Sequence, residues 1–134
     1  MRIINTYSKI TMKRTIVVAE DNEIINRVLE YRLKNDGYEV KVFLNGEDAI
    51  VFMKGNSFDL LITDLYMPVM SGLDVIQTVR DSISSSVPIM AISVTNQEDL
   101  IVRLFAMGVN DFVIKPFRAG ELSVRVKRLI GEQE

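Results

Sequence analysis

The chain alternates short apolar runs with longer stretches in which apolar residues recur at helical spacing. Each run is too short for a helix and is rich in Val, Ile, Leu or Phe, which favours a buried β-strand. The sequence therefore predicts five strands, at residues 15–19, 40–43, 60–63, 89–92 and 112–114.

Between these runs, apolar residues recur every three or four positions with charged residues on the other side, a pattern typical of amphipathic helices. Glycines punctuate the pattern, because Gly37 and Gly108 each follow a stripe and precede a strand. Asn45-Gly46 opens the second helix and Gly55 closes it. The clearest stripes are Ile25, Val28, Leu29 and Leu33; Leu73, Ile76 and Val79; Leu100, Ile101 and Leu104; and Leu122, Val126 and Leu129.

Strands that are apolar throughout and alternate with helices predict a parallel sheet covered on both faces. With right-handed crossovers, five such units give an α/β fold with a flavodoxin-like, doubly wound, five-stranded parallel sheet in the order 2-1-3-4-5.

Length and composition fit one globular domain. The 134 residues, 48% of them hydrophobic, can bury a single core but not two. We predict one domain over residues 14–131, preceded by a poorly ordered N-terminal extension, residues 1–13. No apolar run approaches the ~20 residues that span a bilayer, and no signal peptide is visible. We therefore expect a cytoplasmic protein without membrane contact.

Cysteine and histidine are both absent, which excludes disulfides, thiol nucleophiles, the usual Cys/His zinc sites and histidine-based catalysis. The formal charge of −2 gives no general attraction to nucleic acid, so we expect no direct nucleic-acid binding.

Chemically capable residues stand at the ends of four predicted strands: Glu20-Asp21, Asp64, Ser93 and Lys115. In an open parallel sheet, ligands bind beyond the carboxyl ends of the strands, where the winding reverses. Three carboxylates in one crevice repel each other, and a hard divalent cation such as Mg²⁺ removes that conflict. A lysine for phosphate and a hydroxyl donor complete a set that favours phosphoryl transfer to an aspartate.

Each of these residues alone has an ordinary structural interpretation. The acidic pair at residues 20 and 21 could cap the next helix, Ser93 suits any loop after a strand, and Lys115 could be a surface lysine. Their joint placement at four strand ends favours the functional interpretation.

Residues 14–130 resemble the receiver domain of response regulators from two-component signalling systems. Four motifs carry the resemblance, and all four in this order are specific although each alone is weak. They are residues 16–22 with the acidic pair; Asp64 with Pro68 and Gly72 four and eight residues further on; residues 88–93; and Lys115-Pro116-Phe117.

The resemblance implies that Asp64 is phosphorylated. Asp21, Asp64 and the main-chain carbonyl of Tyr66 would ligate Mg²⁺, for which Mn²⁺ is an alternative. Glu20 would contribute through water, and Lys115 would pair with the phosphoryl oxygens.

It also implies the parts of a switch. Ser93 would move to hydrogen-bond the phosphoryl group, and Phe112 would turn inward behind it. The peptide bond from Lys115 to Pro116 is expected to be cis, an option specific to proline.

Phosphorylation would then change a surface formed by the fourth helix, fifth strand and fifth helix. That surface would contact an effector domain, an effector protein or a second copy of the chain. Arg103, Asp111, Arg118 and Arg125 lie on or near it, although such residues are more often ordinary solvated charges.

The chain has no histidine, so its phosphoryl group must come from a sensor histidine kinase, a histidine phosphotransfer protein or a small acyl phosphate. The protein would promote its own phosphorylation and dephosphorylation without being a turnover enzyme. The sequence does not distinguish a stand-alone regulator from part of a longer regulator or hybrid kinase.

Three positions beside the site are expected to tune the reaction. Val94 stands where the family usually has a very small residue, and a β-branched side chain there could crowd the path to the phosphoryl group. Tyr66 and Thr95, two residues beyond Asp64 and Ser93, should affect the rate of dephosphorylation.

Three other functions remain as alternatives. A phosphorylation-independent pseudo-receiver that acts as a protein interaction module would share the fold. A flavodoxin-like cofactor-binding protein needs a neutral phosphate loop after the first strand, where this chain has Glu20-Asp21-Asn22-Glu23. A small hydrolase with the same acidic cluster would need an Asp-x-Asp nucleophile pattern, which is missing there.

Overall fold

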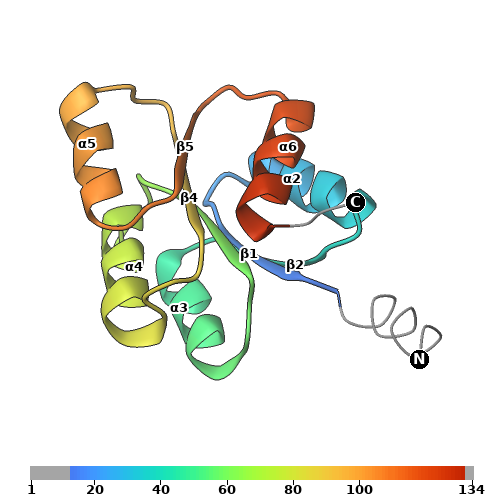
Figure 1. Ribbon diagram of the computed structural model, residues 1–134, viewed down its shortest axis with the longest axis horizontal. Coiled ribbons are helices and arrows are strands. Elements are labelled where there is room, and N and C mark those ends of the chain that lie inside the picture. The colour runs from blue at the N-terminus through green and yellow to red at the C-terminus, as the bar shows by residue number, and fades with distance from the viewer. Residues whose placement is uncertain (1–12, 132–134) are drawn as a thin grey trace.

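Five parallel strands form the centre of the computed structural model, which describes residues 13–131 (Figure 1). They pair in the order β2-β1-β3-β4-β5, as the sequence predicted. Each observed strand agrees with its predicted run to within one residue at either end. The strands are β1 (Thr15–Ala19), β2 (Glu39–Phe43), β3 (Leu60–Asp64), β4 (Ile89–Ser93) and β5 (Asp111–Ile114).

Helices cover both faces of the sheet (Figure 1). The helical segments are α2 (Glu23–Asn35), α3 (Gly46–Gly55), α4 (Gly72–Thr78), η1 (Val79–Ile83), α5 (Glu98–Ala106) and α6 (Ala119–Ile130). Buried residues of α2 and α6 join one apolar cluster with the sheet, whereas those of α3, α4 and α5 join a second cluster on the opposite face.

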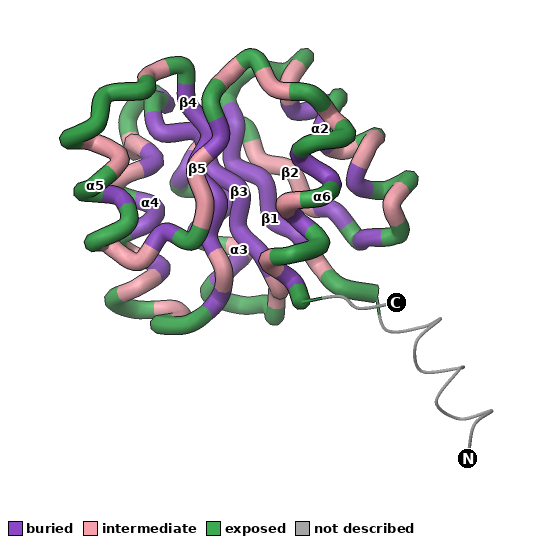
Figure 2. The backbone as a smooth tube through the Cα atoms, turned by 45° about the horizontal axis from the view of Figure 1, so that its top comes forward, coloured by how far each residue is buried: buried purple, intermediate pink, exposed green. Residues whose placement is uncertain are grey.

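The central strands are buried on both faces, which explains why their sequences are apolar throughout. Every residue of β3 and β4 is buried, and the sheet runs as a buried band between layers whose outer surfaces are exposed (Figure 2). Along β1, Ile16 and Val18 pack on one face while Val17 and Ala19 pack on the other. Side chains on both faces of the strand are therefore buried. The alternation of apolar and polar residues that marks a strand with one exposed face is absent.

Local side chains fix where the helices begin and end. The side chains of Asn22, Asn45 and Ser71 accept hydrogen bonds from main-chain N–H groups in the first turns of α2, α3 and α4. Gly37 and Gly108 follow α2 and α5 with φ of 102° and 97°, a conformation that glycine adopts without steric cost.

One detail of the helical prediction was wrong. Val28 is 46% exposed rather than part of the buried stripe, and Asn26 is buried in its place, on the same face as Leu29 and Leu33. The third stripe is confirmed, because Ile76 and Val79 are buried and Leu73 packs against the same cluster. The helix changes from α-helical to π-helical geometry after Thr78, in η1.

The described chain begins and ends at the same end of the sheet, where the strands start. Arg14 Nη1 donates to the carbonyl oxygen of Ile130 at 3.1 Å, and the N–H of Thr15 donates to Asp59 Oδ2 at 2.7 Å. This end of the domain, at the amino ends of the strands, is opposite the end that carries Glu20, Asp64 and Lys115. The predicted disorder at the N-terminus concerns residues that, apart from Lys13, lie outside the described range.

Candidate functional site

The carboxyl ends of β1 and β3 bring three acidic residues together. Glu20 and Asp21 follow β1, Asp64 ends β3, and each offers a carboxylate oxygen within 4.8 Å of the others. Glu20 is completely buried and Asp64 is 5% exposed, whereas Asp21 faces solvent. The neighbouring pair β1 and β3 therefore assembles the predicted acidic cluster.

Lys115, one residue beyond β5, reaches this cluster. Its Nζ lies 2.8 Å from Glu20 Oε1 and 3.5 Å from Asp64 Oδ2. The Lys115–Pro116 peptide bond is cis, as predicted. The single ammonium group thus contacts both buried carboxylates.

Burial dominates the electrostatics of these two carboxyl groups. It raises the pKa of Glu20 above the ordinary value, although the hydrogen bond from Lys115 opposes the shift. Burial also raises the pKa of Asp64. The positive charge of Lys115 lowers that pKa and so opposes part of the shift. Two inward carboxylates facing one ammonium leave a surplus of negative charge.

That surplus fits a divalent cation. The cluster offers only hard oxygen donors, which suit Mg²⁺, and the exposed Asp21 gives a cation access from solvent. Tyr66, whose carbonyl was predicted as a further ligand, stands two residues after Asp64 in the loop between β3 and α4. Asp21, Asp64 and Tyr66 are thus the residues that could hold the ion.

Of the two predicted switch residues, Ser93 lies at the same end of the sheet, whereas Phe112 lies further back in β5, opposite Ala91 of β4. Ser93 ends β4 and is completely buried, and its Oγ accepts a hydrogen bond from the N–H of Thr95 at 3.3 Å. Phe112 is half-buried against the apolar cluster that contains α5. Tyr66 and Val94 are 57% and 71% exposed, so both border the entrance from solvent.

Asn26 and Gly72 support the site from neighbouring elements. Asn26 donates from Nδ2 to the carbonyl oxygen of Glu20 at 2.7 Å. Gly72, which was read only as part of the phosphoacceptor motif, packs so closely on the loop after β3 that a Cβ atom there would overlap the main-chain oxygen of Asp64. Spacing from Leu29 and Leu33 could have placed Asn26 inside, but an amide was not counted in an apolar stripe.

An apolar hollow of about 430 Å³ opens beside Lys115. Its lining includes residues from the start of α2, from the loop after β4 and from the loop after β5. Of these, Ile24 is 74% exposed, Val28 46% and Val94 71%. The lining residues are Ile24, Ile25, Val28, Val94, Lys115, Pro116 and Phe117.

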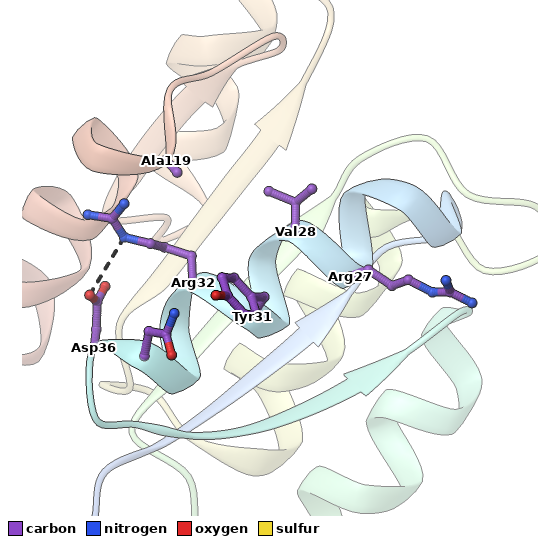
Figure 3. A pocket seen from close by; sticks show the side chains of 7 residues that line it. Arg27, Val28, Tyr31, Arg32, Asp36 and Ala119 are labelled. Carbon is purple, nitrogen blue, oxygen red and sulfur yellow. Dashed lines mark ion pairs between the residues drawn. The ribbon is translucent and has the colours of Figure 1, made fainter.

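A second hollow, of about 520 Å³, lies further along α2 and shares Val28 with the first (Figure 3). Arg32 reaches toward Asp36 there, whereas Arg27 extends the other way (Figure 3). Arg32 Nε also donates to Ser123 Oγ at 2.8 Å, which ties α2 to α6. This hollow contains none of the acidic cluster and no carboxylate pair, so it does not match the predicted chemistry.

The predicted output surface, formed by α5, β5 and α6, contains both paired and unpaired charges. Arg125 Nη1 lies 2.8 Å and 3.1 Å from the two carboxylate oxygens of Asp111, and Arg125 also pairs with Glu121. Arg103 and Arg118 are exposed on the neighbouring helices or their ends.

Within residues 13–131, no helix is long and apolar enough to cross a membrane.

Comparison with known proteins identifies the family. A profile of the response regulator receiver domain matches residues 16–127. The phosphate regulon transcriptional regulatory protein PhoB of Rhizobium meliloti is 34% identical over 116 residues, which are 86% of this chain and 51% of that protein. Sensor histidine kinase TmoS of Ectopseudomonas mendocina is 40% identical over 116 residues, which are 86% of this chain and 12% of the kinase. The chain spans about half the length of the curated transcriptional regulators it matches.

Solved structures agree with the sequence matches. The non-phosphorylated HemR receiver domain of Leptospira biflexa superposes with a TM-score of 0.84 at 27% identity, covering 91% of this chain and 98% of that one. The receiver domain of a sensor histidine kinase from Pseudomonas aeruginosa, with a magnesium ion coordinated in its active site cleft, gives 0.80 at 27% identity, covering 90% and 99%. The chain belongs to the response regulator receiver domain family.

Proposed function

We propose that this protein is a phosphorylation-dependent signalling switch that accepts a phosphoryl group on Asp64. The observation that carries the proposal is the meeting of Glu20, Asp21 and Asp64 within 4.8 Å, with Lys115 in contact with two of them. A carboxylate nucleophile, an oxygen-lined cation site and an ammonium group are the components that phosphoryl transfer needs.

The residues would hold a cation as follows. Asp21, Asp64 and the carbonyl of Tyr66 would ligate Mg²⁺, or Mn²⁺ in its place, and Glu20 would act through water. Such an ion would supply positive charge to offset the negative charge of the acidic cluster and of an incoming phosphoryl group. The buried Glu20 also pairs with Lys115 at 2.8 Å, which keeps the lysine beside Asp64 before the phosphoryl group arrives.

In the transfer step, a carboxylate oxygen of Asp64 attacks the phosphorus of a phosphohistidine. A P–O bond forms as the P–N bond breaks, and the electron pair of that bond leaves with the imidazole. Lys115 then pairs with the phosphoryl oxygens. The chain promotes this step and the later hydrolysis on itself, so it is not a turnover enzyme.

The new acceptor oxygens change the balance between conformations of the switch. The hydroxyl of Ser93 exchanges its bond with Thr95 for one to the phosphoryl group, and Phe112 turns inward behind it. The altered surface of α5, β5 and α6 contacts an effector domain, an effector protein or a second copy of the chain. Direct nucleic-acid binding is not part of this function, and the site of action is the cytoplasm.

The phosphodonor is a sensor histidine kinase or a histidine phosphotransfer protein. It docks on the apolar hollow beside Lys115, where Ile24 and Val94 are 74% and 71% exposed. Ile24→Glu should slow transfer from a phosphorylated histidine phosphotransfer domain but leave the rate with acetyl phosphate unchanged. Val51→Glu, at a 72% exposed position on α3, serves as the matched control, and equal slowing by both changes would contradict the docking site.

Intact-protein mass spectrometry tests the central proposal. After incubation with acetyl phosphate and Mg²⁺, the protein should gain one phosphoryl group. The gain should disappear on chelation of the metal and in Asp64→Asn, but persist in Asp74→Asn, which changes an exposed carboxylate at the start of α4. Absence of labelling under all conditions would favour the second candidate, a phosphorylation-independent pseudo-receiver that acts as an interaction module.

A further inference from the structure

Asn26 is a polar residue in the buried interface between α2 and the sheet. It is 4% exposed and lies on the same face of α2 as the completely buried Leu33. Its side-chain Nδ2 donates to two main-chain oxygens, that of Glu20 at 2.7 Å and that of Phe43 at 3.4 Å. The amide therefore joins the first turn of α2 to the residue after β1 and to the last residue of β2.

These bonds meet on one residue of the acidic cluster. The N–H of Glu20 donates to the carbonyl oxygen of Phe43 at 3.0 Å, so Phe43 accepts from both Glu20 and Asn26. The N–H of Asn22 donates to Glu20 Oε2 at 3.0 Å. The main chain of Glu20 is thus fixed on both its amide and carbonyl sides, and Asp21 follows directly from it.

The side-chain oxygen of Asn26, in contrast to Nδ2, has no hydrogen-bond partner in the described part of the chain. Its Oδ1 is buried and accepts no hydrogen bond from any group in the described part of the chain. A buried carbonyl oxygen without a donor is unfavourable, and this cost accompanies the hydrogen bond by which Nδ2 holds the carbonyl oxygen of Glu20. A local cost of this kind beside a cation site indicates a constraint from function rather than from packing.

We propose that Asn26 is a positioning residue for divalent-cation binding. By holding the carbonyl of Glu20, it sets the direction in which the chain leaves β1, and with it the carboxylate of Asp21. This inference rests on the proposed function, because it assumes that the acidic cluster binds Mg²⁺. Outer residues that orient metal ligands typically change metal affinity by about 10- to 100-fold when replaced.

Calorimetric titration of the full chain with MgCl₂, together with thermal unfolding in its absence, separates positioning from packing. Asn26→Leu removes the Nδ2 donor but keeps the number of side-chain heavy atoms and the branch at Cγ, and Asn26→Ser keeps a polar but shorter side chain. Ser123→Ala is the matched control, because Ser123 is also buried between α2 and α6 and donates to Asp36 at 2.6 Å, at the far end of α2.

We expect both Asn26 variants to bind Mg²⁺ at least about tenfold more weakly than the wild type. Asn26→Leu should unfold at a lower temperature than the wild type, because the buried carbonyl oxygen of Glu20 loses its donor. Ser123→Ala should also lose stability but keep its Mg²⁺ affinity. Mg²⁺ affinity within twofold of wild type in a folded Asn26 variant would overturn the inference and leave the proposed function intact. The inference would also be overturned if Ser123→Ala weakened Mg²⁺ binding equally, or if both Asn26 variants failed to fold. A wild-type protein that binds no Mg²⁺ would overturn both.

Discussion

Two buried carboxyl groups, those of Glu20 and Asp64, lie against the single ammonium group of Lys115. Burial raises the pKa of both acids, so the folded protein holds a proton on them more tightly than the unfolded chain does. Such a shift favours folding at low pH, and the advantage disappears as the pH rises through the folded-state pKa. At neutral pH the metal-free site therefore opposes folding.

Asp64→Asn should stabilise the metal-free protein, because it leaves Glu20 and Lys115 as a balanced pair. We expect a gain on the order of 1 kcal/mol at pH 7. The gain should shrink as the pH falls through the raised pKa of Asp64 toward its ordinary value of 3.8. Urea unfolding across this pH range with a chelator present measures it. The exposed change Asp74→Asn should have almost no effect, and a destabilised Asp64→Asn would contradict the account.

Val94→Ala should speed phosphorylation by acetyl phosphate. Val94 is exposed and lines the hollow that contains Lys115, so its β-branched side chain stands near the approach to Asp64. We expect roughly a threefold faster reaction, which is about 0.7 kcal/mol of barrier. Val51→Ala, far from the hollow, is the control. Identical rates for Val94→Ala and wild type would rule out crowding.

The main site residues could be predicted because strand ends of a parallel sheet meet at one edge. This rule brought Glu20, Asp64 and Lys115 together from positions far apart in the chain. It could not show the role of Asn26, since that depends on a side chain bending back to Glu20 from the next helix. Nor could it show that Lys115 pairs more closely with Glu20 than with Asp64.

At the scale of elements, α4 begins in direct contact with the loop that carries Asp64. The N–H of Gly72 donates to the carbonyl oxygen of Leu65 at 2.9 Å, and a Cβ on Gly72 would lie 2.7 Å from the Cα of Leu65. The start of this helix therefore sets the path of the loop after Asp64, the proposed phosphorylation site.

Gly72→Ala should destabilise the protein by roughly 1–3 kcal/mol, since main-chain atoms cannot give way as a flexible side chain can. It should also slow phosphorylation by displacing Asp64. Gly120→Ala, in α6, is the matched control because a Cβ there meets nothing within 4 Å, and it should stabilise by about 0.5–1 kcal/mol. Denaturant unfolding and the acetyl phosphate rate measure the two effects. Equal stability of the two variants would disprove the close contact.

The strands were predictable as elements, whereas the end of α4 was not. Continuous burial makes a strand recognisable from its own residues, as Leu60 to Asp64 illustrate. The η1 segment contains Arg80, whose Nη2 donates at 2.7 Å to the carbonyl oxygen of Gly108, which lies 28 residues further along the chain. Contacts over such separations have no signature in local spacing, so a regular helix was expected there.

At the scale of the molecule, cation binding and folding should be linked. The acidic cluster exists only when β1 and β3 pair, so Mg²⁺ should bind the folded state and not the unfolded chain. A free Mg²⁺ concentration 100 times the dissociation constant should then add about 2.7 kcal/mol to the free energy of unfolding.

Thermal unfolding at increasing MgCl₂ measures this linkage. The melting temperature should rise in the wild type and in Asp99→Asn, an exposed change on α5, but much less in Asp21→Asn. A rise of the same size in Asp21→Asn would place the cation elsewhere.

The bond between Arg14 and Ile130 has a consequence for how such a domain can be combined with others. Strands of five residues separate this junction by about 16 Å from Asp64, the proposed phosphorylation site. A polypeptide fused at either side would be tethered at the opposite end of the domain and would leave the acidic cluster accessible to a phosphodonor. The proposed switch could therefore serve different fusion partners, provided that each one detects a change in the surface of α5, β5 and α6.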